Sequence, residues 1–104
     1  MYKENYEFPA IIVSHSSEDY EIRIYDFKEV TVYDDSLEEC YLEIQEALEA
    51  EIYKYICLNK EIPKATPKEN IPLDYNQTIF NIKINTEDAI RKSKKLGVIV
   101  PDNL

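Results

Sequence analysis

The chain has 104 residues and a formal net charge of −9 at pH 7, with 21 acidic residues against 12 basic ones. This length allows one domain with a modest core and excludes a second one. The acidic balance argues against a body that grips a phosphate backbone, and favours a basic partner or simple solubility. No apolar run approaches the ~20 residues of a membrane span, and the first residues lack the apolar core of a secretion signal, so we expect a cytoplasmic protein.

The first third of the chain has the residue alternation of β-strands. Residues 6–13, 20–25 and 30–33 are rich in aromatic and β-branched side chains and predict three strands. Strict alternation over residues 20–25 predicts antiparallel pairing with the first strand. Pro9 favours an edge position for that first strand, because proline lacks the N–H that a central ladder needs.

Residues 34–59 predict one long amphipathic helix that begins near Leu37. Ser36 is a favourable N-cap, and Glu39 stands three residues later, as in a capping box. At 100° per residue, one apolar stripe contains Leu37, Cys40, Tyr41, Ile44, Leu48, Ile52 and Tyr55. We expect this stripe to pack on the sheet, with the glutamates of the helix outside it.

The second half of the chain supplies a connector, a strand and a second helix. Residues 60–72 contain three prolines and predict an extended connector, whereas the alternation over residues 78–84 predicts a fourth strand. Asn85 can cap a second helix, and Gly97 stands where a helix end needs positive φ. The last seven residues predict a short strand and a turn. The expected fold is α+β in the order βββαβα: a mainly antiparallel sheet of three or four strands with the long helix on one face.

The segments YEFPAII, YEIRIYDF and DDSLEECYLEIQEALEAEIYKY, followed by the proline-rich connector, resemble the HicB family, the antitoxins of type II toxin–antitoxin pairs. The resemblance covers roughly residues 6–96, assigned to a domain over 1–96, and is most specific in the long helix. The chain departs from the family pattern in two turns, because YDFKEV lacks the usual proline and glycine, and Asp35-Ser36 replaces a glycine-containing turn.

The resemblance implies a non-catalytic protein that binds and neutralises a HicA-type mRNA-cleaving toxin and forms dimers or tetramers. It also implies a DNA-binding unit after this domain. Residues 97–104 resemble the first strand of a ribbon–helix–helix, so we expect either a longer parent protein or a member without its operator-binding half. DNA contact would then need a part absent here. The alternative is a solitary HicB-like regulatory or structural module without a toxin.

A metal-dependent nuclease is the third hypothesis, because the family's sheet has been compared to RNase H. Its candidate cluster would be Asp26, Asp34, Asp35 and Glu38. Turn and helix-start positions explain these acids better. The single histidine, His15, predicts a solvated loop residue, and the two cysteines have no metal-binding spacing. We therefore expect no enzymatic activity, no cofactor and no bound metal.

The acidic helix face could imitate the RNA of a basic toxin, and exposed tyrosines favour interfaces. The predicted partner-binding residues are Tyr25, Asp26, Tyr33, Asp34, Asp35, Leu42, Glu46, Glu49 and Tyr53, whereas Tyr20, Tyr41 and Tyr55 are predicted core. A basic cluster on the second helix could contact phosphates, although the helix dipole also explains it: Arg91, Lys92, Lys94 and Lys95.

Overall fold

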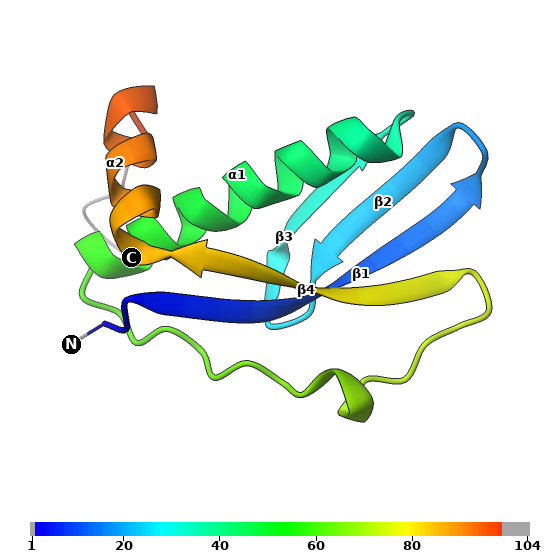
Figure 1. The fold of residues 1–104 in the computed structure, drawn as a ribbon, viewed down its shortest axis with the longest axis horizontal. Coiled ribbons are helices and arrows are strands. Elements are labelled where there is room, and N and C mark those ends of the chain that lie inside the picture. Colours follow the sequence, from blue (N-terminus) through cyan, green and yellow to red (C-terminus); the bar gives the residue numbers. More distant parts are fainter. Residues whose placement is uncertain (1, 99–104) are drawn as a thin grey trace.

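The computed structural model describes residues 2–98 (Figure 1). Its elements are β1 (Asn5–Ser16), β2 (Asp19–Ile24), β3 (Phe27–Asp34), α1 (Leu37–Cys57), a short 3₁₀ turn η1 (Lys68–Asn70), β4 (Gln77–Asn85) and α2 (Thr86–Leu96). The four strands form one antiparallel sheet in the order β3-β2-β1-β4, and α1 covers one face. The α+β fold in the order βββαβα is confirmed. The predicted terminal strand falls almost entirely on residues 99–104, outside the described part.

The predicted edge position of Pro9 is wrong, because β1 pairs with β2 on one side and with β4 on the other. The Tyr25 amide donates to the Pro9 carbonyl at 3.1 Å, just beyond the last β1–β2 pair, Ala10 with Ile24. The nitrogen and carbonyl of one strand residue point the same way, so the missing N–H of Pro9 faces Tyr25, where β2 has ended. The sheet therefore loses a hydrogen bond only at the end of a ladder.

The main core lies between α1 and the helix-facing side of the sheet. Four residues of the predicted stripe, Cys40, Ile44, Leu48 and Ile52, are completely buried. Facing them are strand residues that include Phe8, Ala10, Ile22, Ile24, Ile82 and Ile84. Tyr20 and Tyr55 pack against this core as predicted. Tyr41 is 40% exposed and meets Phe80 edge-to-face at 5.0 Å between ring centroids, so it borders the core instead of filling it.

The helix ends follow from local chemistry. Ser36 Oγ accepts the Glu39 amide at 3.3 Å, but the Ser36 amide donates to Asp34 Oδ1 at 3.0 Å, so half of the expected capping box is replaced by an aspartate turn. For α2, Asn85 Oδ1 accepts the Asp88 amide at 2.9 Å. Gly97 ends this helix with φ +71°, as predicted.

The connector first packs against the main core through Ile62 and Ala65, and its later part reaches the opposite face of the sheet (Figure 1). Ile71 is buried against Ile11 and Val13, in a small second core that α1 does not touch. Asp26, in the β2–β3 turn, fastens the connector: its Oδ2 accepts the Thr66 amide at 3.0 Å and its Oδ1 accepts the Thr66 hydroxyl at 2.6 Å. The connector is thus extended but held in place.

Candidate partner-binding site

The structure divides the nine predicted partner-binding residues among four places. Tyr33 lies on β3, Tyr25 and Asp26 form the β2–β3 turn, Asp34 and Asp35 lead into α1, and α1 carries Leu42, Glu46, Glu49 and Tyr53. They do not form one surface. Some of them are held by hydrogen bonds or ion pairs within the fold, whereas others are exposed to solvent.

The side of the sheet away from α1 has an aromatic and charged corner at β2 and β3. Tyr33 is 66% exposed there. Beside it, Glu21 is buried, although it carries a charge, and it interacts with His15 Nε2 at 3.0 Å and with Arg23 Nη1 at 3.2 Å. The contacts of Glu21 could not be predicted from the sequence, because the pairing of β1 with β2 brings His15 next to it. His15 itself is exposed, as predicted, but the predicted loop position is wrong, because β1 continues to Ser16.

Asp26 has a structural role in this arrangement, because both carboxylate oxygens accept hydrogen bonds from Thr66.

Among residues 2–98, no group of three or more His, Cys, Asp or Glu side chains is placed to hold a metal ion. Within the same range, no helix is long and apolar enough to cross a membrane.

On the flank of α1 that meets α2, charges are paired inside the protein. Glu49 is only 4% exposed, and its Oε2 lies 2.9 Å from Lys92 Nζ. Arg91 pairs with Asp88 at 2.7 Å. Two of the four basic residues predicted to contact phosphate are therefore engaged within the fold, and Glu49 is not part of an exposed acidic face. Lys94 and Lys95 remain exposed near the end of α2.

The flank of α1 that faces β3 brings like charges together. A hydrogen bond between the Asp34 and Glu43 carboxyl groups lowers the pKa of Asp34 and raises the pKa of Glu43. The nearby carboxylates of Glu39 and Glu46 raise the pKa of Glu43 further. Of the two carboxyl groups, Glu43 is thus the one that takes up a proton more readily.

A second carboxyl pair lies further along the same flank. Burial, and then a hydrogen bond to Glu29, raise the pKa of Glu51, whereas the same hydrogen bond lowers the pKa of Glu29. Lys54 Nζ lies 3.1 Å from Glu51 Oε1. We call the carboxyl groups on this flank the acidic seam, which consists of Glu29, Asp34, Asp35, Glu39, Glu43, Glu46 and Glu51. Within residues 2–98, the contact between Glu51 and Lys54 is the one ion pair of the acidic seam.

The solvent side of α1 carries a thin line of three apolar or aromatic residues, Leu42, Tyr53 and Cys57. This leucine is 58% exposed, Tyr53 is half-buried and Cys57 is an exposed free thiol. Together with the acidic seam, Leu42 gives the N-terminal half of α1 an apolar residue surrounded by carboxylates. Such a mixture suits a protein contact more than a catalytic site.

Comparisons with known proteins give structural matches only. No protein-family model matches the chain, and no curated protein matches it in sequence. The N-terminal domain of the Burkholderia pseudomallei antitoxin HicB superimposes with a TM-score of 0.67 at 14% identity, over 77% of this chain and 99% of that one. A chain of a toxin–antitoxin complex from Streptococcus pneumoniae superimposes with a TM-score of 0.70 at 13% identity, over 91% of this chain and 90% of that one. The fold is therefore that of the HicB N-terminal domain, as the sequence resemblance predicts.

Proposed function

We propose that this chain is an antitoxin-like protein that binds a small basic toxin of the HicA type and covers its RNA-cleaving surface. It would have no chemistry of its own. The likeness in fold to an antitoxin domain supports the general class. The single observation that carries the proposal is the acidic seam, where carboxyl groups meet other carboxyl groups and Glu51 with Lys54 is the one ion pair that the seam makes among residues 2–98.

Like charges that the fold holds together are a cost in the free protein, and a basic partner would remove that cost. Neighbouring carboxyl groups raise the pKa of Glu43, and arginine or lysine side chains placed at Asp34 and Glu43 would form ion pairs that favour its ionised form. The surrounding carboxylates would also attract a basic protein from a distance and accelerate its association. An RNA-cleaving protein already has cations arranged for phosphates, so a row of carboxylates can occupy the same places.

The proposal extends to assembly and location. β3 and β4 are the edge strands of the sheet, and an open edge can pair with another copy, so we expect a homodimer or homotetramer. Action on a toxin that cleaves mRNA places the protein in the cytoplasm. DNA contact is assigned to a ribbon–helix–helix unit beyond residues 1–96, with exposed Lys94 and Lys95 as its nearest basic neighbours.

The test begins with capture of a partner by the tagged full chain from a lysate of the source cells. The captured protein is then purified and mixed with RNA, and the chain is added in increasing amounts. We expect the wild-type chain to stop RNA cleavage near a one-to-one ratio. A Glu43→Lys/Glu46→Lys variant should need at least roughly tenfold more protein, because it reverses charge within the seam.

A matched control carries the same change of charge elsewhere. Glu18→Lys/Glu69→Lys alters two exposed glutamates away from α1 and should inhibit like the wild type. Equal loss of inhibition in both variants would reduce the effect to net charge. Capture of nothing but the chain itself, or of a protein without RNA-cleaving activity, would contradict the proposal and favour the solitary HicB-like module.

A further inference from the structure

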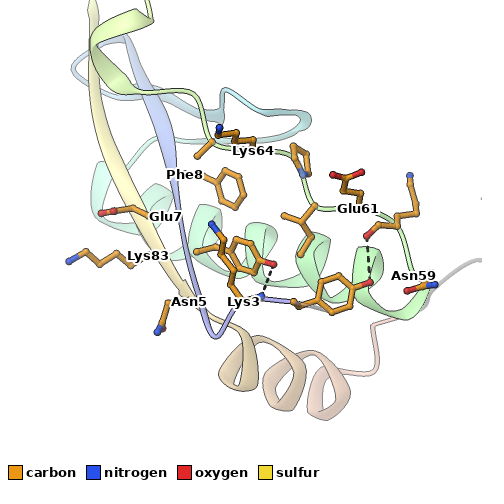
Figure 2. A pocket seen from close by; sticks show the side chains of 14 residues that line it. Lys3, Asn5, Glu7, Phe8, Asn59, Glu61, Lys64 and Lys83 are labelled. Carbon is orange, nitrogen blue, oxygen red and sulfur yellow. Dashed lines mark hydrogen bonds between the residues drawn. The ribbon is translucent and has the colours of Figure 1, made fainter.

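A groove with a volume of about 910 Å³ lies between the start of β1 and the segment that follows α1 (Figure 2). None of the residues that line it belongs to the acidic seam. Its apolar lining consists of Tyr2, Tyr6 and Phe8 on one side and Ile62, Pro63 and Ala65 on the other. Tyr2 donates its hydroxyl to the Lys60 carbonyl at 3.5 Å, which links the two sides at one end. The volume falls in the range that holds small-molecule ligands.

Three lysines border this groove and make no ion pair among residues 2–98, although Lys60 lies close enough to Glu29 to help lower the pKa of that carboxyl group. Lys3 Nζ lies 5.9 Å from the centroid of the Tyr6 ring, and Lys60 Nζ lies 4.6 Å from that of the Tyr55 ring. Lys64 is the third. Glu7 and Lys83 also border the groove, but Figure 2 shows both directed away from it, along the outside of the strands. Glu61 is then the one acidic residue that remains at its rim.

The groove gathers three of the 12 basic residues of a chain that has 21 acidic ones. Among residues 2–98, Arg23, Lys54, Arg91 and Lys92 each contact a carboxylate, whereas the other eight basic residues make no ion pair. Two of the groove lysines rest on aromatic rings, and such a contact attracts the ammonium group without neutralising its charge. The groove is consequently a local concentration of positive charge in an acidic protein.

We propose that the groove binds a nucleoside phosphate. A flat base fits between aromatic and aliphatic walls, and lysine ammonium groups bind phosphate oxygens as point charges. The net charge of −9 opposes a long polyanion more strongly than a small one, so a mononucleotide is favoured over an RNA strand. Lys60 and Lys64 hold the phosphate, and Tyr2 and Tyr6 contact the base.

The test is a titration of the full chain, labelled with ¹⁵N, with adenosine monophosphate at low ionic strength, followed by NMR. We expect amide shifts confined to residues 2–8 and 59–65, with a Kd below about 1 mM. Adenosine and inorganic phosphate, tested separately, should each bind roughly tenfold more weakly, because each offers one half of the recognition. Lys60→Gln/Lys64→Gln should raise the Kd for adenosine monophosphate roughly tenfold. Lys28→Gln/Lys68→Gln changes two exposed lysines outside the groove by the same charge and should bind normally.

Four results would overturn the proposal. Shifts spread over the surface, or an equal loss in both double variants, would indicate non-specific attraction. Inorganic phosphate that binds as tightly as the nucleotide would reduce the groove to an anion site only. Tighter binding of a pentaglutamate peptide would make the groove a site for an acidic protein segment.

Discussion

On the flank of α1 that faces α2, Glu49 is buried and paired with Lys92, whereas on the flank that faces β3, Glu43 meets the carboxyl group of Asp34. Both glutamates stand in the same run of acidic helix residues, and nothing in their spacing separates them. The difference arises from the elements that pack beside each flank. Glu49 is paired with a cation inside the fold, whereas Glu43 makes no ion pair within residues 2–98. Asp26, tied to Thr66, is likewise held within the fold.

The largest effect should come from the core that lies beneath both flanks. Leu48→Ala removes a completely buried side chain and should lower the free energy of unfolding by about 2–5 kcal/mol. Leu42→Ala, at a 58% exposed position of the same helix, should change it by less than about 0.5 kcal/mol. Urea denaturation measures both. Equal losses would contradict the placement of α1 and the comparison built on it.

The paired flank should be sensitive in an asymmetric way. Lys92→Met leaves the buried carboxylate of Glu49 without its cation and should cost about 1–3 kcal/mol of unfolding free energy. Glu49→Gln leaves an exposed lysine that water can solvate, and it should cost less. A double-mutant cycle measured by urea denaturation isolates the coupling. A coupling energy near zero would mean that Lys92 does not stabilise Glu49, and the two flanks of α1 would then not differ in the pairing of their glutamates.

The other acid held within the fold can be tested in the connector. In Asp26→Asn the side chain can still accept from the Thr66 amide and donate to the Thr66 hydroxyl, but the charge that strengthens both hydrogen bonds is lost, at a cost of about 1 kcal/mol. Hydrogen exchange should accelerate over residues 60–72, while that of α1 stays unchanged. Asp19→Asn, at an exposed position, is the matched control. Unchanged exchange of the connector would refute the fastening role.

The seam predicts a smaller effect that depends on pH. Burial raises the pKa of Glu51 above its ordinary value of 4.5, so the folded chain binds this proton more strongly than the unfolded chain does. That contribution is present below pH 4.5 and is lost as the pH rises through the raised pKa. Relative to wild type, Glu51→Gln should therefore gain in Tm between pH 4.5 and 7. The control Glu69→Gln, in the connector, should leave the dependence of Tm on pH unchanged. If Tm of Glu51→Gln followed the same pH dependence as wild type, Glu29 and Glu51 would not belong to the acidic seam.

The sequence predicted best what is decided within a few residues. The cap at Ser36, the buried stripe of α1, the cap at Asn85 and the positive φ of Gly97 all depend on neighbours within one or two helical turns. The HicB-like fold was predicted at the same level, through the order of such segments.

The parts that failed, or that only the structure supplied, depend on distant neighbours. Glu49 meets Lys92 across 43 positions and Asp26 meets Thr66 across 40, so no local pattern identifies either acid as occupied. The central place of Pro9 was also missed, because the strand order depends on where β4 returns. The groove lysines come from distant parts of the chain. Lys3 lies near its start, whereas Lys60 and Lys64 lie in the connector, and only the fold brings them together.

The association rate of the captured basic protein, measured by stopped flow at low and high ionic strength, tests the docking role of the acidic seam most directly. The account predicts fast association of the wild-type chain at low salt. It predicts roughly tenfold slower association of Glu43→Lys/Glu46→Lys, and a difference that shrinks as salt is added. Glu18→Lys/Glu69→Lys should retain most of the wild-type rate. Equal rates for the seam variant and the wild type at low salt would contradict the claim that the unpaired acids of α1 and β3 are there for a basic partner.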